Sequence, residues 1–487
     1  MTVSLDLSVL LVVLAPIIGA ILVLVADLVA PRQQRAHYAI AFISLLLGVY
    51  GTLATLAADP GNTAKTLCLD AVNCLYEVNA VSATLQLAAL LGAMAVLALG
   101  WPLERPQQAD RTSTQIVLLL TATSGAVGVA GARDLASWLV LLELATVPVV
   151  VLVAIPGTRR ALDGAMQLLT TSLVSFGLLV LGAALWYAAT GSALLRPNAV
   201  LAVDTSAQRA LLTLSVVLIL SGIGFKLSLA PFHAWTPATY AGAPLPIATF
   251  LAAVSKVAAL AAVVVVMQAL AALGGSALAT IAVLAILSMT IGNVVALRQN
   301  DVVRLLAWST VGQAGWVIMP LVSISPSGVK AASGYLLGYV VATIVAFTVV
   351  TIVARGAQSQ RGRAPYQLDA YRGLLRARPG LGGALALALT SLAGLPPGLL
   401  GLVTKVLALR PVLAEGWWVL AVLAAVNVVI GVAVYVRWFR VLLEPLPAPA
   451  LPSSVRTHPS HAIALATSAT LLLVLSLAPQ SMLGLFG

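Results

Sequence analysis

The sequence predicts an all-α, polytopic membrane protein with about fourteen transmembrane helices. Hydrophobic residues make up 61% of the 487 residues and charged residues only 8%, whereas a soluble globular chain is about 25% charged. The mean hydropathy is +1.06, and the apolar residues fall into long runs. Because too little charge remains to cover a water-facing surface, most of the surface must face lipid.

The apolar runs have the length of membrane spans, since crossing about 30 Å of hydrocarbon takes roughly 20 residues of helix. A membrane β-barrel would instead show alternating segments of about 10 residues, and no such pattern occurs in the sequence. The predicted spans lie near 8–30, 37–58, 78–100, 114–131, 135–155, 162–190, 210–229, 246–267, 277–296, 305–324, 331–354, 381–409, 417–436 and 462–483.

The basic residues predict the orientation. The 26 Lys and Arg exceed the 15 Asp and Glu and give a net charge of +11. In a soluble protein this excess suggests nucleic acid, but in a membrane protein it is typical of basic cytoplasmic loops. Seventeen basic residues fall in alternate loops beginning with the first, and six in the opposite loops. We therefore expect both termini on the outer side of the membrane, lipid around the chain and no nucleic-acid partner.

The remaining three basic residues, Lys226, Lys256 and Lys405, lie inside apolar runs. The chain has only five lysines against 21 arginines, and no arginine lies as deep. A desolvated lysine can lose its proton, whereas an arginine effectively cannot. Lysine at this depth therefore indicates groups that titrate.

An acid accompanies these amines, because Glu143 lies near the middle of the predicted fifth span. An isolated charge at that depth costs at least ~2.5–3.5 kcal/mol, so it should face the bundle interior or water and pair with another charge. One buried acid with three buried amines favours a proton or ion path. The alternative is a static ion pair that only fixes the packing.

Two predicted spans are interrupted by prolines next to these lysines. Proline breaks a helix, and in lipid a break is tolerated only where protein or water satisfies the freed backbone groups. The prolines are Pro231, Pro237, Pro244 and Pro246 after Lys226, and Pro396 and Pro397 before Lys405.

Broken helices in spans seven and twelve, five spans apart, predict two inverted five-helix repeats. On this division, residues 1–113 hold helices 1–3 and residues 114–270 hold the first repeat, helices 4–8. Residues 271–445 then hold the second repeat, helices 9–13, and residues 446–487 hold helix 14.

His233 lies just past the Pro231 break. An imidazole that titrates near neutral pH can pass protons between Lys226 and Lys256. The alternative is a loop histidine that hydrogen-bonds the freed carbonyls. We assign no role to the other histidines, which are His37, His458 and His461.

Two cysteines and four histidines leave little material for haem, iron–sulfur or zinc sites. We therefore expect no cofactor or metal in this chain, and redox chemistry in partner subunits. Cys68 and Cys74 share the outward loop after the second span, and oxidising conditions there can join them.

Two loop features have competing interpretations. Asp301 and Arg304 form an interfacial pair or mark a helix start, in preference to a functional role. The segment 355–379 carries six arginines, which can pair with anionic lipid headgroups or a neighbouring subunit. A loop that only sets topology is the preferred interpretation.

Three stretches resemble a known family. GFKLSLAPFHAWTPATYAGAPLPIATFLAAVSK is similar to the central signature of membrane subunit N of bacterial NADH-quinone oxidoreductase, respiratory complex I. GNVVALRQNDVVRLLAWSTVGQAGW and DAYRGLLRARPGLGGALALALTSLAGLPPGLLGLVTK resemble the next two blocks. The resemblance runs from about Leu135 to Pro445, and the FK…PFHxWTP stretch favours subunit N over the sister subunits L and M. All three resemble subunits of multi-subunit sodium/proton antiporters.

The resemblance implies a proton path along charged residues at the membrane midplane. Glu143 matches the family's fifth-span glutamate, and Lys226 the lysine of the broken seventh span. Lys256 matches the eighth-span lysine and Lys405 the lysine of the broken twelfth span, while His233 matches the histidine of the PFH motif. The sequence departs from the family pattern at Met166, where a sixth-span lysine is usual, at Gln313, where a histidine is frequent, and at Ala238, where an aspartate follows WTP.

The expected function is a non-redox, proton-translocating subunit of an NADH-quinone oxidoreductase. NADH, FMN, iron–sulfur clusters and quinone would bind partner subunits, and the chain would contact an adjacent antiporter-like subunit and small membrane subunits. The alternatives are a subunit of a multi-subunit sodium/proton antiporter without redox coupling, and a partly structural, divergent subunit.

Overall fold

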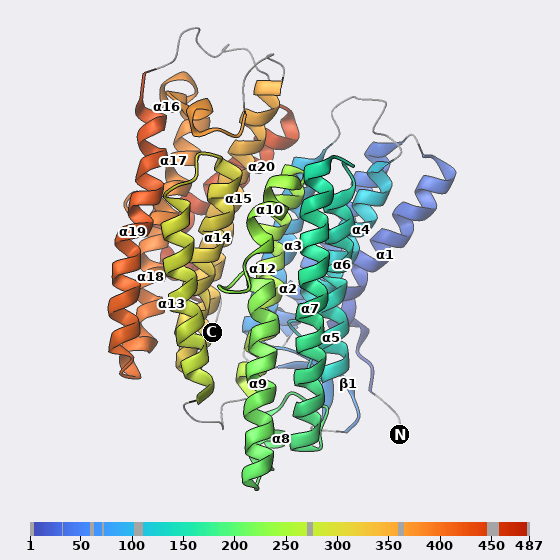
Figure 1. The fold of residues 1–487 in the computed structure, drawn as a ribbon. Coiled ribbons are helices and arrows are strands. Elements are labelled where there is room, and N and C mark those ends of the chain that lie inside the picture. The colour runs from blue at the N-terminus through green and yellow to red at the C-terminus, as the bar shows by residue number, and fades with distance from the viewer. Residues whose placement is uncertain are drawn as a thin grey trace.

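The structure of the chain, a computed structural model, is a bundle of long helices that run side by side between its two ends (Figure 1). It describes residues 4–31, 33–58, 63–70, 73–101, 111–269, 276–358, 365–445 and 457–484.

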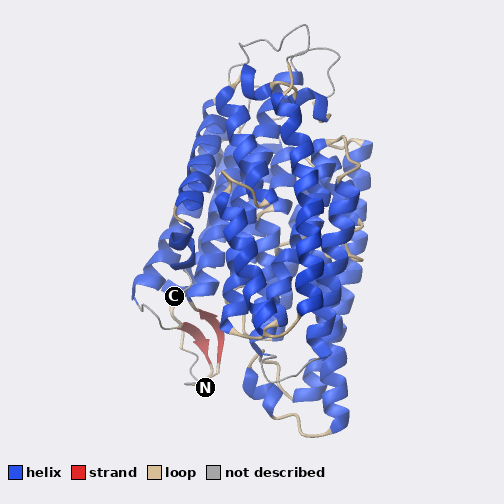
Figure 2. Cartoon of the chain, turned by 90° about the vertical axis from the view of Figure 1, so that its left-hand side faces the viewer, coloured by secondary structure: helices blue, strands red, loops and turns tan. Residues whose placement is uncertain are grey.

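The N-terminal part consists of three long helices and a β-hairpin. The helices are α1 (Leu7–Val29), α2 (Gln34–Ala58) and α3 (Ala80–Gly100), and the hairpin pairs β1 (Ala64–Cys68) with β2 (Cys74–Val78). The two strands are antiparallel, and Cys68 lies opposite Cys74, to which it is joined by a disulfide. The hairpin lies at one end of the bundle (Figure 2), and the expected disulfide is thus present.

The middle of the chain, up to residue 269, forms nine helical elements. Several begin at side chains that cap the free N–H groups of the first turn: Asp134 accepts from two backbone amides of α5, and Thr205 and Gln208 form a capping box at α9. The elements are α4 (Thr112–Gly128), α5 (Leu135–Leu144), α6 (Val147–Ala154), α7 (Arg159–Thr190), α8 (Pro197–Leu201), α9 (Ser206–Leu227), α10 (Trp235–Gly242), α11 (Leu245–Ala252) and α12 (Val254–Ala269).

The rest of the chain is also helical. Asp301 caps α14 by accepting from the backbone N–H groups of Val303 and Arg304, so Asp301 marks a helix start. The elements are α13 (Ser276–Ala296), α14 (Val302–Ile318), η3 (Met319–Val322), α15 (Pro326–Gln358), η4 (Leu368–Tyr371), α16 (Leu374–Ala377), α17 (Pro379–Ala393), α18 (Leu399–Ala414), α19 (Trp418–Leu443), α20 (Pro459–Leu477) and α21 (Pro479–Leu483).

The fold class is the predicted one, a polytopic helical membrane protein, with the small β-hairpin as the exception to an all-α chain. Among the described residues, twelve helices are long and apolar enough to cross a membrane. The predicted spans 114–131 and 381–409 are not among them, because α4 has 17 residues and the other range is divided between α17 and α18. The count of fourteen and the two inverted repeats remain predictions, and the proposed boundary at 270/271 lies outside the described residues.

Both predicted helix breaks are present, between α9 and α10 and between α17 and α18. Two further interruptions divide the fifth and eighth spans at Ala145–Thr146 and at Ala253. Pro148 contributes to the first, because it has no N–H to donate to the carbonyl of Leu144. The additional breaks lie three residues from Glu143 and from Lys256, respectively.

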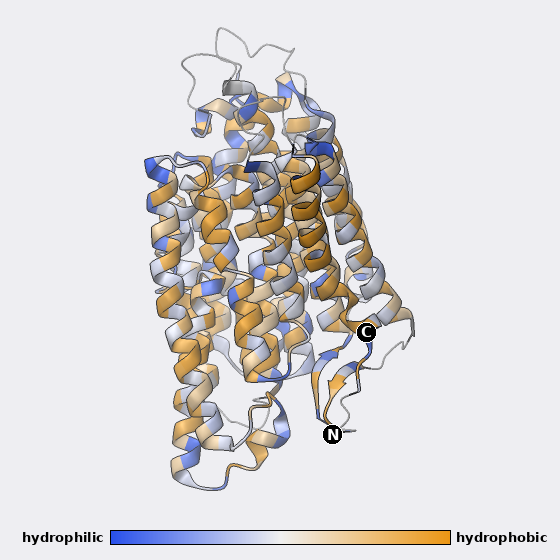
Figure 3. Ribbon diagram, turned by 90° about the vertical axis from the view of Figure 1, so that its right-hand side faces the viewer, coloured by the Kyte–Doolittle hydropathy of each residue, from blue (hydrophilic) through white to orange (hydrophobic). Residues whose placement is uncertain are grey.

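The interior of the bundle is formed by α11–α12, α14 and α15. In each of the first two spans 94% of the membrane-length window is buried, and in α15 83%, compared with 39% in α1 and 22% in α20. The outer helices are coloured as hydrophobic over much of their length (Figure 3). The molecule therefore has a buried interior surrounded by an apolar, lipid-compatible surface.

The basic residues separate between the two ends of the bundle. Lys65, Arg133 and Arg196 from the smaller set gather around Glu77 of the hairpin, with N···O distances of 3.9, 3.6 and 2.7 Å. Burial lowers the pKa of Arg133, and the nearby Glu77 carboxylate acts in the opposite direction.

Arg372, from the larger set, lies between η4 and α16 at the other end (Figure 1) and pairs with Asp369 and Glu444. Both termini are near the hairpin end (Figures 2 and 3). Five members of the larger set lie outside the described residues, namely Arg32, Arg105, Arg361, Arg363 and Arg456.

Candidate functional site

The first part of the site is a buried ion pair at the broken fifth and seventh spans. Lys226, 5% exposed, lies in the last turn of α9, and its Nζ donates to Glu143 Oε1 at 2.9 Å and to Thr146 Oγ1 at 2.8 Å. Thr146 is a residue of the α5–α6 break, so this break supplies the second acceptor. The two predicted charges are therefore brought together, with a hydroxyl beside them.

Lys256 is connected to this pair through the end of helix α9. Its Nζ donates to the backbone carbonyl of Lys226 at 2.9 Å and to Ser228 Oγ at 2.6 Å. Ser228 is in the left-handed region (φ +67°), where the chain leaves the helix. The ammonium also lies 4.9 Å from the centre of the Trp235 ring, within the range of a cation–π contact. A single helix end thus joins two of the predicted lysines.

Lys405 occupies a similar position at the second broken helix. Its Nζ donates to the carbonyls of Leu392 and Ala393, the last residues of α17, at 2.9 and 2.6 Å. Gly394 follows with φ +81°, and a Cβ there would lie 3.0 Å from Nζ. Glycine is therefore required both by the backbone conformation and by the closeness of the lysine.

Both Lys256 and Lys405 cap the C-terminal end of a half-helix. The last carbonyls of a helix lack intrahelical partners and carry partial negative charge, which favours a cation. Among the described residues, neither amine has a carboxylate within ion-pair distance, and Glu143 is the one acid that pairs with a buried lysine. Their charged forms consequently depend on helix-end carbonyls.

A network of hydroxyl and amide groups adjoins Lys405. Gln313 Nε2 donates to the Leu392 carbonyl at 3.3 Å, the same oxygen that Lys405 contacts, and to the Tyr435 hydroxyl at 2.9 Å. Gln313 Oε1 accepts from the Tyr335 hydroxyl. Gln313, noted above as a departure from the family pattern, is thus the centre of a polar network and not a gap in it.

Aromatic rings and hydroxyls fill the space between the two helix breaks. The Trp235 ring, which faces Lys256, is 6.3 Å from the ring of Tyr240. The Tyr240 hydroxyl is buried without a hydrogen-bond partner among the described residues, and Tyr339 is its electrostatic neighbour. The Thr310 and Tyr339 hydroxyls hydrogen-bond each other at 2.8 Å.

His233 makes no hydrogen bond to Lys226 or Lys256 in the described part of the chain. It belongs to the α9–α10 break, and its ring packs 5.1 Å from that of Trp308 on α14. Its Nδ1 is buried and has no hydrogen-bond partner in the described part of the chain. The predicted relay role remains untested, and the direct contact between the two lysines is the backbone carbonyl of Lys226, which accepts from Lys256 Nζ.

The other two departures lie outside this network. Met166 is 56% exposed on α7, so its side chain faces lipid or a neighbour. Ala238 belongs to α10 where that helix meets α7, and a Cβ on Gly164 would lie 3.1 Å from its carbonyl oxygen. Neither contacts the buried lysines in the described structure.

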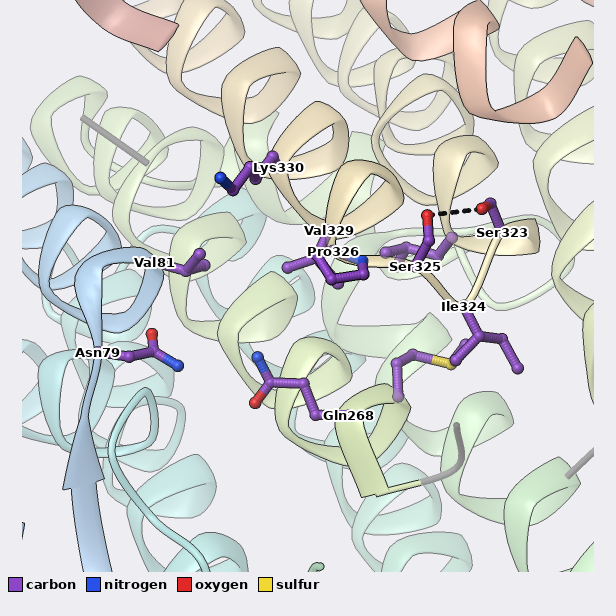
Figure 4. Close-up of a pocket in the computed structure, with 11 residues that line it drawn as sticks. Asn79, Val81, Gln268, Ser323, Ile324, Ser325, Pro326, Val329 and Lys330 are labelled. Atoms are coloured by element: carbon purple, nitrogen blue, oxygen red, sulfur yellow. Dashed lines mark hydrogen bonds between the residues drawn. The ribbon is translucent and has the colours of Figure 1, made fainter. Parts of the chain in front are cut away.

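Two cavities open near the hairpin end, and both are lined by Lys330. One, of about 420 Å³, is also lined by Tyr335, Thr404 and Arg410, so it reaches from charged residues to the network beside Lys405. The other, of about 340 Å³, is drawn in Figure 4, where Asn79 and Gln268 line it together with Lys330.

Sequence reasoning found the charged residues but missed Thr146, Ser228 and the tyrosines. Tyr335 and Tyr339 are four residues apart inside an apolar run, hence on one helix face, and this spacing was the available signal. No group of three or more His, Cys, Asp or Glu side chains in the described ranges is placed to hold a metal ion.

Comparisons with known proteins agree with the resemblance. Residues 132–431 match the family described as NADH:quinone oxidoreductase/Mrp antiporter, TM. NADH-quinone oxidoreductase subunit N of Salinispora tropica is 36% identical over 435 residues, which cover 86% of this chain and 81% of that one.

Two solved structures extend the comparison. A chain of respiratory complex I from Thermus thermophilus, with bound aureothin, has a TM-score of 0.80 and 30% identity over 97% of this chain and 98% of that chain. A chain of the Mrp complex from Dietzia sp. has a TM-score of 0.79 at 18% identity, over 99% and 96% of the two chains, and so shares the fold.

Proposed function

This chain belongs to the NADH:quinone oxidoreductase/Mrp antiporter transmembrane family, among the relatives named subunit N, and on that premise we propose that it translocates protons in a respiratory complex of the NADH-quinone oxidoreductase type. The observation that carries the proposal is a pair of linked contacts at one broken helix: Lys226 Nζ donates to the Glu143 carboxylate, and Lys256 Nζ donates to the Lys226 carbonyl and the Ser228 hydroxyl. If the ion pair only fixed the packing, there would be no need for a second buried amine, Lys256, which lies beside the pair and has no acid partner of its own among the described residues.

The proposed cycle begins at the ion pair. Glu143 favours the protonated form of Lys226, and burial favours the neutral form, so a change in the pairing switches the amine between them. Breaking a buried pair costs about 3–5 kcal/mol, and moving one charge against the membrane potential costs about 2.3 kcal/mol per 100 mV. The free energy released when the pair re-forms is therefore large enough to move one proton against a membrane potential of about 100 mV.

In this proposal the released proton passes through water from the Lys226 ammonium to the Lys256 amine, which the Ser228 hydroxyl holds in place. It continues to the Lys405 amine across the hydroxyls of Tyr240, Thr310 and Tyr339. The cavity beside Tyr335 and Thr404 then leads outward from Lys405, on the side of the membrane where the hairpin and both termini would lie. His233, on the α14 side of the break, is a second proposed relay.

The redox chemistry in this proposal belongs to other subunits. NADH, FMN, iron–sulfur clusters and quinone would bind there, and quinone reduction would change a charge near Glu143. The chain would sit in a bacterial inner membrane beside an adjacent antiporter-like subunit, small membrane subunits and lipid.

A second candidate is a sodium/proton antiporter subunit without redox coupling. The fold shared with the Mrp complex chain and the joint family description favour it. A partly structural role is a third candidate, because Met166, Gln313 and Ala238 are neutral where the family pattern described above has titratable groups.

Purification of the intact complex through a tag on this chain separates these candidates. The proposal predicts co-purifying subunits with iron–sulfur clusters and quinone-dependent proton translocation by the reconstituted complex. Sodium-dependent proton exchange that persists with a quinone-site inhibitor, in a preparation without redox subunits, would support the antiporter instead.

A further inference from the structure

An apolar groove of about 500 Å³ runs along α3 and α20, and we call it the α3–α20 groove. Side chains of α2, α15 and α21 complete its walls, and almost all of its lining is apolar. It opens to the membrane side of the chain, because its lining residues Leu91, Ile463 and Leu471 are 50%, 62% and 42% exposed. The groove is thus accessible to a hydrocarbon chain from the bilayer.

A basic group lies at one end of this groove. Arg355 of α15 is half-buried, and its Nη2 donates to the carbonyl of Leu99 at 3.0 Å. Its Nη1 lies 2.5 Å from Nε2 of His461, which is 2% exposed. These three residues, Arg355, Leu99 and His461, form the Arg355 cluster.

Helix geometry places the cluster in line with the groove. Arg355 follows Leu337 by 18 residues, about five turns at 3.6 residues per turn, so both share one face of α15. His461 lies one turn before Ala464, and Leu99 is next to Ala98; both Ala464 and Ala98 line the groove. The cluster therefore caps three of the helix faces that form the walls.

The charge of Arg355 is not balanced by protein. Its hydrogen-bond partners are neutral, and no carboxylate among the described residues lies within ion-pair distance of it. Tyr38 and Trp101 lie beside it, with rings 4.9 Å apart and the Tyr38 hydroxyl on the carbonyl of Gly100 at 2.6 Å. Aromatic side chains of this kind mark the headgroup level of a bilayer.

We propose that the α3–α20 groove binds one acyl chain of an anionic phospholipid whose phosphate pairs with Arg355. Apolar burial alone does not select this occupant, since a lipid tail is already in hydrocarbon; filling the groove restores the dispersion contacts that an empty one forfeits. Selectivity comes from the cation at the end of the groove. A helix of a neighbouring subunit would fill the groove but would leave Arg355 without an anion.

The test uses the intact complex in bilayers that contain equal amounts of phosphatidylglycerol and phosphatidylcholine. One of the two lipids carries a photoreactive group in its acyl chain, and labelled peptides are identified by mass spectrometry. We expect labelling within residues 84–98 and 463–475, about fivefold stronger with phosphatidylglycerol, as roughly 1 kcal/mol for one cation beside an anionic lipid implies.

Four variants separate the contributions. Arg355→Gln should abolish the lipid preference and Arg355→Lys should keep it, while Ala95→Phe, which narrows the groove, should reduce labelling by both lipids. Arg437→Gln is the matched control. Like Arg355, Arg437 donates to backbone carbonyls, in its case those of Leu297 and Gln299, and it lies away from the groove.

Three results would overturn the proposal: equal labelling by both lipids in the unmodified complex, an equal loss in Arg437→Gln, or cross-links from these peptides to another subunit in place of lipid.

Discussion

Lys226 and Lys256 are held at the same helix end by different means. Lys226 has a carboxylate and a hydroxyl, whereas Lys256 has only a backbone carbonyl, a hydroxyl and an indole face. A proton on Lys226 is therefore stabilised by the formal charge of Glu143. A proton on Lys256 is stabilised by fixed dipoles, as expected for an intermediate proton carrier between Lys226 and Lys405.

Glu143→Gln tests the formal charge at nearly constant shape. We expect proton uptake by membrane vesicles to fall by roughly tenfold or more, because even 1.4 kcal/mol of lost pairing is a factor of ten. Asp163→Asn, an exposed acid on α7, is the matched control and should leave uptake unchanged. Equal uptake in the two variants would remove Glu143 from the mechanism.

Tyr335→Phe tests the network beside Lys405. It removes the donor to Gln313 and leaves a buried amide oxygen unsatisfied, at a cost of about 1–3 kcal/mol. The ring can remain stacked on Trp316, 5.8 Å away, so the complex should still assemble while proton uptake falls severalfold. Tyr187→Phe, at a 57% exposed position, should change neither; a matching loss there would attribute the effect to a general defect.

Charge counting located the buried charged residues, because a buried charge is costly wherever it occurs. The neutral members of the site could not be found in this way. Ser228 and Thr146 are ordinary residues of helix termini, and their role depends on which carbonyl or amine lies opposite. Gln313 was read as the loss of a histidine, but the structure places its amide between Leu392, Tyr335 and Tyr435.

At the scale of elements, the sequence predicted the breaks that prolines cause. Pro231 and Pro396–Pro397 interrupt spans seven and twelve as expected. The breaks at Ala145–Thr146 and Ala253 were not predicted, since one has its proline two residues later and the other has none. The hairpin was not predicted either, because two five-residue strands between long apolar runs give a much weaker periodic signal than the membrane helices around them.

The hairpin's disulfide gives a prediction at this scale. Cys68 and Cys74 should resist thiol labelling until a reductant is added, and then both should react. Replacing both with Ser should destabilise the hairpin by about 2 kcal/mol, as the closure entropy of so short a loop implies, and lower the melting temperature of the complex. Complete labelling without reductant would show that the bond is absent from the membrane-embedded protein.

At the scale of the whole molecule, two clusters of basic residues lie at opposite ends of a nearly uncharged bundle. The smaller set surrounds Glu77 at the hairpin end, and the larger includes Arg372 at the other. This separation supports the predicted orientation. On the predicted orientation, the cavity beside Tyr335 lies on the outer side, where the proposed mechanism has protons leave.

Single cysteines introduced into a chain without Cys68 and Cys74 test this orientation. Thr205→Cys, in an exposed loop of the smaller basic set, should react in intact cells with a membrane-impermeant thiol reagent. Asn300→Cys, exposed at the other end, should react only after the membrane is opened. The reverse labelling pattern would show that the chain has the opposite orientation in the membrane, and protons would then enter through the cavity beside Tyr335 instead of leaving through it.

The central claim is that buried lysines carry protons while redox chemistry occurs in other subunits. Its most direct test is the number of protons translocated per electron by the reconstituted complex with Lys405→Met. Methionine keeps the approximate volume but cannot bind a proton. We predict that quinone reduction continues while protons per electron decrease. An unchanged ratio at normal assembly would contradict the proton path through this chain.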